Sequence, residues 1–193
     1  PWAVHDNNST TYGEYYWAKR SCKAYAGSYS GWGVGGGADG ASLACGSNYP
    51  DNADSWMVYG PFSLSGATAA DLKFKLWLNT ESTNDKVCRE ASINGTDFYG
   101  TCTSVNTNGW VDKVLDLTNV YTLGDLRGQP NVWVRLRVFS NGSVNYPEGA
   151  YVDNIVLRKC TAASCPASAA PNFDYDQTVD VLATMTLGQG IRD

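Results

Sequence analysis

Six cysteines carry the clearest chemistry in this chain of 193 residues. None belongs to a C-x-x-C pair, and the chain has one histidine, so these residue types do not predict a zinc site. Sequence alone allows several connectivities. Local spacing favours three disulfides, each adding about 3 kcal/mol by restricting the unfolded chain: Cys22 with Cys45, Cys88 with Cys102, and Cys160 with Cys165. Such a framework predicts a secreted protein, extracellular or on a cell surface.

Hydrolytic chemistry has little support from the remaining polar residues. A nucleophilic triad would need His5, which lies in a polar leading segment that we expect to be a loose chain end. The G-x-S-x-G motif of serine hydrolases is absent from the sequence. Glycoside hydrolysis needs two carboxylates at a set separation, and nothing in the sequence sets one among the candidates: Glu81, Asp85, Glu90, Glu148 and Asp153. We therefore predict that the chain is not an enzyme.

Asp153 is the carboxylate that most needs a partner, because it interrupts an otherwise apolar strand pattern near the end of the domain. A Ca²⁺ ion binds several oxygens, which loop carboxylates, amides and carbonyls supply. Glu81 and Asp85 share a loop and are the other acids that we expect at such a site. Backbone N–H groups, Arg135 or Arg137 are the alternative partners of Asp153.

Four aromatic residues surround the glycine-rich stretch 33–40 and could bind a glycan: Tyr25, Tyr29, Trp32 and Tyr49. A flat ring on a loop can stack on a sugar face. Core packing, edge cover and interface contacts are the alternative roles of such rings.

Composition limits the kind of partner. The net charge is −5 and no Lys/Arg cluster occurs, so we do not expect nucleic-acid binding, which needs a basic surface. Hydrophobic residues make up 43% of the chain, enough to bury a core. No apolar run is long enough to form a transmembrane segment.

Alternating apolar and polar residues predict strands at several places: 56–59, 72–78, 114–117, 132–138 and 151–157. Asn94-Gly95 predicts a tight hairpin, which Cys88 and Cys102 flank. The glycines of residues 33–40 predict a loop or a bulged edge. No crossover helix is indicated, so the fold class is all-β: an antiparallel two-sheet β-sandwich, or jelly roll, with an extra C-terminal β-strand.

Several motifs in sequence order resemble a known family: 56-WMVYGPFSL-64, 69-AADLKFKLW-77, 92-SINGTDF-98, 108-NGW-110, 115-LDL-117 and 149-GAYVDNI-155. Over about residues 25–158, the chain is similar to MAM-like jelly-roll domains of secreted bacterial peptidases of the immune inhibitor A type. The resemblance implies a domain without catalytic residues that serves adhesion, substrate contact or inter-domain packing. It also implies a structural cation near Asp153. The peptidase zinc motif of that family is absent here.

The C-terminal segment has a pattern of its own. We expect a jelly roll over residues 1–160, an Ala/Ser/Pro linker over 161–172 and a strand segment over 173–193. Apolar residues occupy odd positions of this strand, and Gln177 and Leu182 break the alternation. The predicted assembly strand is formed by Phe173, Tyr175, Val179, Val181, Met185 and Leu187.

A long amphipathic strand is not stable alone in water, so it must pair with something. It could pair with an edge of its own domain, with a neighbouring copy by strand donation, or within a following domain. Donation from each copy to the next does not close and builds a filament. We expect the polar segment before Tyr15 to leave an edge or groove open to accept it. The prediction is a non-catalytic extracellular subunit for cell adhesion or assembly, with copies of itself as partners. The alternative is a carbohydrate- or substrate-binding accessory module of a secreted hydrolase.

Overall fold

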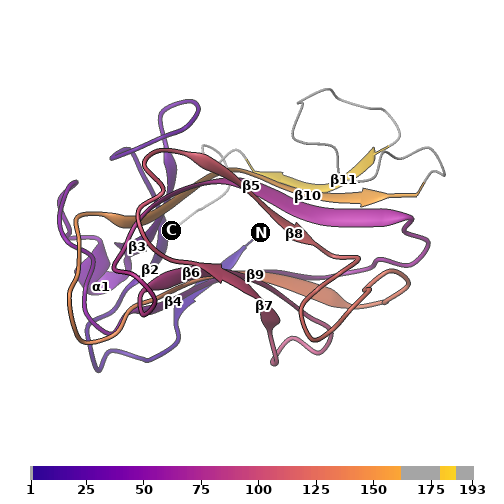
Figure 1. Ribbon diagram of the computed structural model, residues 1–193, viewed down its shortest axis with the longest axis horizontal. Helices are drawn as coiled ribbons and strands as arrows, with labels where there is room; N and C mark the ends of the chain where they lie inside the picture. The colour runs from indigo at the N-terminus through magenta and orange to yellow at the C-terminus, as the bar shows by residue number, and fades with distance from the viewer. Residues whose placement is uncertain (1, 162–178, 186–193) are drawn as a thin grey trace.

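The computed structural model describes residues 2–161 and 179–185, which form two antiparallel β-sheets packed face to face (Figure 1). The first sheet has the strand order β1-β4-β9-β6-β7. Its strands are β1 (Ala3–Asp6), β4 (Asp54–Phe62), β9 (Val132–Phe139), β6 (Lys86–Ser92) and β7 (Tyr99–Thr103). The second sheet has the order β2-β3-β10-β5-β8, and β11 also pairs with β10. Its strands are β2 (Tyr16–Arg20), β3 (Ser30–Gly36), β10 (Gly149–Cys160), β5 (Ala69–Asn79), β8 (Val111–Asp116) and β11 (Val179–Met185). These strands confirm the predicted β-sandwich.

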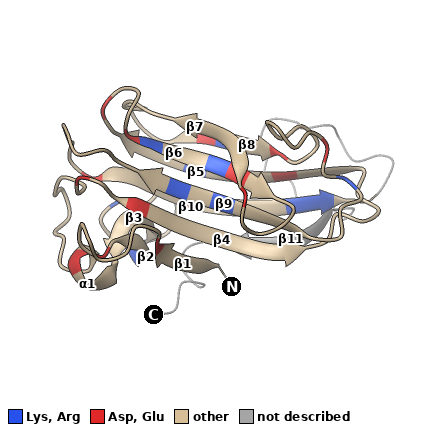
Figure 2. Cartoon of the chain, turned by 90° about the horizontal axis from the view of Figure 1, so that it is seen from below, with Lys and Arg blue, Asp and Glu red and all other residues tan. Residues whose placement is uncertain are grey.

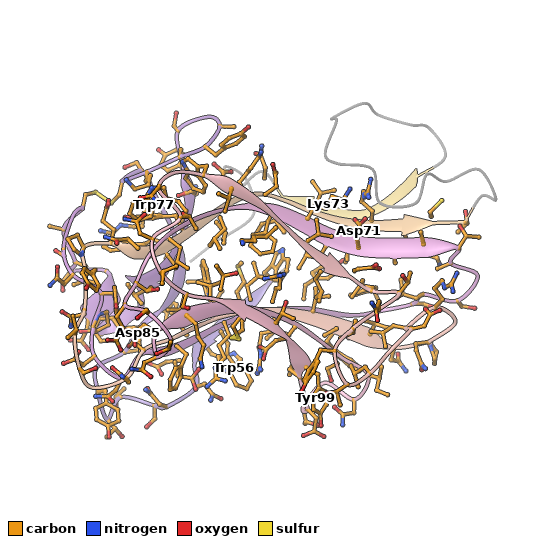
Figure 3. All side chains as sticks on the ribbon, in the orientation of Figure 1. Trp56, Asp71, Lys73, Trp77, Asp85 and Tyr99 are labelled. Atoms are coloured by element: carbon orange, nitrogen blue, oxygen red, sulfur yellow. A yellow bond between two sulfur atoms is a disulfide. The ribbon has the colours of Figure 1, made fainter. Side chains whose placement is uncertain are left out.

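The hydrophobic core lies between the sheets and follows the alternation of the sequence. The apolar positions of β5 and β9 face inward and are buried: Leu72, Phe74, Leu76, Leu78, Val132, Val134, Leu136 and Val138. Each fully buried large side chain contributes about 1.5–3 kcal/mol. Polar and aromatic residues between them face outward, as Trp77 does above the sheet in Figure 3.

The glycine-rich stretch differs from the prediction. Residues 30–36 form the buried strand β3, and Gly37–Gly40 form the short helix α1, in place of a loop or edge. Glycine is needed in this strand because the two sheets approach closely. A Cβ on Gly33 would lie 2.4 Å from Cγ2 of Val138 on the facing sheet.

The predicted tight hairpin is a wider loop. Ala91 pairs with Tyr99, so residues 93–98 connect β6 and β7. Gly95 has a positive φ, whereas the Asn94 side chain organises the turn by accepting hydrogen bonds from the backbone N–H groups of Thr96 and Asp97.

Candidate functional site

β10 is an unusual strand, because two other strands share one of its two hydrogen-bonding edges. On one side, this strand pairs with β5 along its whole length. On the other side, β3 pairs with Tyr151 and Val152 alone, while β11 pairs with residues 155–160. β3 and β11 therefore use opposite ends of the same edge (Figure 1). Without β11, the second half of this edge would be unpaired among the described residues.

β11 confirms the predicted strand over residues 179–185, and it pairs within the chain. The register shifts between Leu157 and Arg158, whose partners are Ala183 and Val181. Leu182 is left without a Cα partner, at a position where the sequence alternation breaks. The other predicted members of the strand, Phe173, Tyr175 and Leu187, lie outside the described residues.

Two predicted disulfides are confirmed. Cys22 bonds Cys45, and Cys88 bonds Cys102 directly across the β6–β7 pair. Cys160 is also disulfide-bonded. Its predicted partner, Cys165, lies outside the described residues. These bonds indicate folding in an oxidising compartment.

Asp153 is fully buried, and its carboxylate accepts backbone hydrogen bonds. Oδ2 accepts from the N–H groups of Tyr25 at 2.8 Å and Ala26 at 3.1 Å, and Oδ1 accepts from that of Asn154 at 2.7 Å. This carboxylate therefore anchors the loop before β3 onto β10. The alternative cationic partners are engaged elsewhere, since Arg135 pairs with Glu90 and Arg137 with Asp54.

Glu81 and Asp85 lie together in a cluster of loops at one end of the sandwich (Figure 3 labels Asp85). Asp85 is buried and accepts hydrogen bonds from the Tyr49 hydroxyl and, at 2.8 Å, from the Asn141 N–H. Burial raises the pKa of the Asp85 carboxyl above its usual value, while these two hydrogen bonds lower it.

The structure does not bring the three predicted calcium ligands together. Asp153 lies four residues along β10 from Gly149, about 13 Å away. Glu81 and Asp85 lie beyond the end of β5 that pairs with Gly149. Among the described residues, no group of three His, Cys, Asp or Glu could hold a metal ion. The oxygens of Asp153 already accept backbone hydrogen bonds and do not fit a calcium site. Calcium binding by this protein stays a prediction.

Two of the predicted glycan-binding rings are buried and cannot present a face to a sugar. Trp32 stacks on Tyr151 with ring centroids 5.5 Å apart, and the Arg20 guanidinium lies 5.2 Å from its ring centroid. Tyr49 is buried by the loops around Asp85. Trp32 and Tyr49 were predicted to be exposed because they lie near the glycine-rich stretch, but residues 30–36 of that region form a buried strand.

The other two predicted rings are exposed. Tyr25 and Tyr29 are 43% and 42% exposed on the segment before β3. The Lys75 ammonium lies 4.5 Å from the Tyr25 centroid, and that of Lys19 lies 4.9 Å from the Tyr29 centroid. Trp110 meets Tyr25 edge-on at 6.0 Å.

Trp77 adds a ring that was not predicted as a site residue. It is half-buried on the outward face of β5, two residues from Lys75, with the Lys23 ammonium 4.2 Å from its centroid. The sequence could have identified it, because Trp77 occupies a position that the strand alternation assigns to the outward face. We call Tyr25, Trp77 and Trp110 the aromatic surface.

On the outward face of the first sheet, charged and aromatic side chains contact one another. Glu90 pairs with Arg135 at 2.8 Å, and the Arg135 guanidinium lies 3.9 Å from the Trp56 centroid and 4.3 Å from that of Phe98. His5 lies in β1 opposite Trp56, so it is not at a loose chain end. Charges of both signs alternate over the face shown in Figure 2.

A groove of about 730 Å³ lies between the edge strands β1 and β2. Its lining includes Val4, Glu14 and Lys19, and Trp17 lies beneath it without exposed surface. The leading segment was predicted to leave a groove that accepts the C-terminal strand. A groove is present, but β11 pairs with β10 and not with this groove. Among the described residues, no helix is long and apolar enough to cross a membrane.

The fold places the chain among antiparallel two-sheet β-sandwich domains. No protein-family model matches the sequence, and no curated protein matches it. The K2 cleaved adhesin domain of Lys-gingipain is similar in structure, with a TM-score of 0.50 and 15% identity over 80% of this chain and 87% of that chain. This likeness shows the fold.

Two further solved structures are similar at lower scores. The K3 cleaved adhesin domain of Lys-gingipain from Porphyromonas gingivalis W83 has a TM-score of 0.49 and 15% identity, over 81% of this chain and 90% of that chain. TmCBM61, solved with β-1,4-galactotriose, has a TM-score of 0.45 and 13% identity, over 82% and 88%. The resemblance to MAM-like domains stays a prediction.

Proposed function

We propose that this chain is a non-catalytic extracellular adhesion or assembly subunit whose copies associate by donating the C-terminal strand. The observation that carries the proposal is the connection between β10 and β11. Cys160 and Val179 are paired neighbours, yet residues 161–178 join them. A hairpin connection needs about two to five residues.

The length of this connection supports exchange between copies. Eighteen residues span up to about 60 Å when extended. If Cys160 bonds Cys165 as predicted, the thirteen residues that follow still span about 43 Å. The strand of one copy can therefore reach the β10 edge of another copy. There it can form the same backbone pairs that β11 forms with β10 of its own chain.

The β10 edge supplies a reason for the strand to bind. Ile155 and Leu157 face the core and are buried beside β11. Residues 155–160 would present unpaired N–H and C=O groups without it. Because donation from copy to copy is a heterologous contact, it builds a filament unless it closes into a ring.

A disulfide trap tests the proposal. Val156 and Thr184 are Cα partners in the β10–β11 register. One preparation carries Val156→Cys and another carries Thr184→Cys. After mixing, partial unfolding to allow exchange and oxidation, donation predicts a crosslinked dimer on a non-reducing gel. Val156→Cys mixed with Asp180→Cys, whose register partner is Lys159, is the control with mismatched register, and it should crosslink much less.

Deleting residues 171–193 provides the second arm. The truncated chain should fold and stay monomeric by sedimentation, and a peptide of residues 171–190 should bind it without extending a fibre. A chain that carries both Val156→Cys and Thr184→Cys serves as the reference for pairing within one chain. If this double variant crosslinks within one chain while the mixed single variants give no dimer, the strand pairs in cis and the proposal is wrong. Assembly by the truncated chain would also contradict it.

Glycan binding is the second candidate function, and the aromatic surface is the observation that favours it. Lysine ammonium groups lie against Tyr25 and Trp77, while Tyr25 keeps 43% of its surface exposed. Affinity electrophoresis with neutral β-glycans tests this candidate. Tyr25→Ala and Trp77→Ala should abolish retardation, and Tyr121→Ala, which removes a ring that is 71% exposed outside this surface, should not. Equal retardation of all variants would exclude this surface.

A further inference from the structure

Two cations face the core side of the sandwich at the edge formed by β7 and β8. Arg89 pairs with Leu136 in the first sheet, so its side chain is on the inward face of β6. Lys113 pairs with the buried Phe74 and is on the inward face of β8. The Arg89 Nε–H donates to the carbonyl oxygen of Val114 at 2.9 Å, which places its guanidinium next to the residue that follows Lys113.

Neither cation has an anionic partner among the described residues. Arg89 makes its other hydrogen bond with the Thr103 hydroxyl at 3.3 Å, and this leaves most guanidinium N–H groups unused. Lys113 makes no hydrogen bond or ion pair within residues 2–161. The two nearest acids along these strands point outward and are engaged, Glu90 with Arg135 and Asp112 with Lys75.

Both groups lose favourable solvation in this position. Burial lowers the pKa of the Lys113 ammonium, and the positive charge of Arg89 lowers it further. Burial also lowers the pKa of the Arg89 guanidinium. An uncompensated pair of partly buried like charges is costly, and one anion between them would relieve both costs.

We propose that Arg89 and Lys113 together bind one oxyanion group, a carboxylate or sulfate, at the β7–β8 edge. Both side chains are half-buried and so remain reachable from solvent. The free guanidinium and ammonium N–H groups supply charge-assisted hydrogen bonds, and the inward position of Thr103 supplies a hydroxyl beside them. This site is independent of strand donation and of the aromatic surface.

Thermal unfolding with sodium sulfate, at ionic strength held constant with sodium chloride, tests the site. The wild-type midpoint should rise saturably, by about 3–5 °C at ten times Kd. Lys113→Met should unfold at a higher temperature than wild type without sulfate, because the repulsion is gone, and its sulfate-dependent rise should be lost. Lys86→Met is the matched control, because Lys86 lies on the outward face of the same strand as Arg89, and it should respond as wild type does.

Competition identifies the source of the anion. Trigalacturonic acid that displaces sulfate at a much lower concentration than acetate indicates an acidic sugar, whereas equal displacement indicates a free ion. An equal sulfate response in wild type, Lys113→Met and Lys86→Met would overturn the proposal. The absence of any saturable rise in the wild type would also overturn it.

Discussion

At the scale of single residues, buried polar groups explain how loops are held on this sandwich. Asp153 shows how such a group is satisfied. The sequence identified it as a carboxylate in an apolar strand that must have a partner, and left open whether that partner is an ion, an arginine or the backbone. The structure supplies three backbone N–H groups from two segments. Charge-assisted bonds of this kind are stronger than neutral ones.

We expect Asp153→Asn to lower the free energy of unfolding by about 2–3 kcal/mol. The amide keeps one acceptor oxygen but turns N–H groups toward backbone donors. The loss, measured by urea unfolding, should be equal in calcium and in chelator. Asp97→Asn changes an exposed acid and should shift stability by less than about 0.5 kcal/mol. A calcium-dependent loss confined to Asp153→Asn would instead place the ion at this residue.

At the scale of elements, β3 and β10 determine what the second sheet can do. β3 is rich in glycine, and it needs one at position 33 because a Cβ there would overlap Val138 of the facing sheet. β10 is long enough for two strands to share one edge, β3 at one end and β11 at the other. The available half of that edge is where the C-terminal strand binds.

Gly33→Ala should destabilise the fold by about 1–3 kcal/mol, because its Cβ would overlap the Val138 side chain. Val138→Ala opens a cavity and is also destabilising. In the double variant the new methyl group enters that cavity, so a double-mutant cycle by chemical denaturation should show favourable coupling of about 1 kcal/mol or more. Gly142→Ala, in an exposed loop, is the control. Additive losses for Gly33 and Val138 would mean that the sheets separate to absorb the overlap.

At the scale of the whole molecule, the proposed assembly would compete with the closed monomer through the connection from β10 to β11. β11 forms the same backbone pairs whether it binds β10 of its own chain or β10 of another copy. Pairing within the chain therefore competes with pairing between copies. A long connection weakens the local advantage, since loop closure costs more entropy as the loop lengthens. Assembly should therefore depend on protein concentration.

Deleting residues 167–177 should convert the chain to a monomer at every concentration. The seven remaining connecting residues keep Cys165 and suffice for a hairpin, and they shorten the reach from about 60 Å to about 23 Å, which favours pairing within the chain. Analytical ultracentrifugation and electron microscopy supply the measurement. A Gly/Ser segment of the original length in place of residues 167–177 is the control and should still assemble. Filaments of the shortened chain would show that assembly does not use this strand.

Local pattern by itself determined much of this protein. Period-two alternation in stretches such as 72–78 and 132–138 specified strands, their buried faces and the all-β class, because a strand's inside and outside are set by neighbouring residues alone. Cysteine spacing also identified two disulfides, since each closes a short loop.

Tertiary structure decided what depends on strand order. Trp32 and Tyr49 are buried, and Tyr25 is exposed, because of which strands and loops come to lie over them. β11 can pair with β10 because β3 leaves that strand after two pairs. Arg89 and Lys113 lie near each other because β7 and β8 end the two sheets at the same rim and β6 lies next to β7. These contacts join residues far apart in the chain, and a pattern with a range of a few residues carries no information about them.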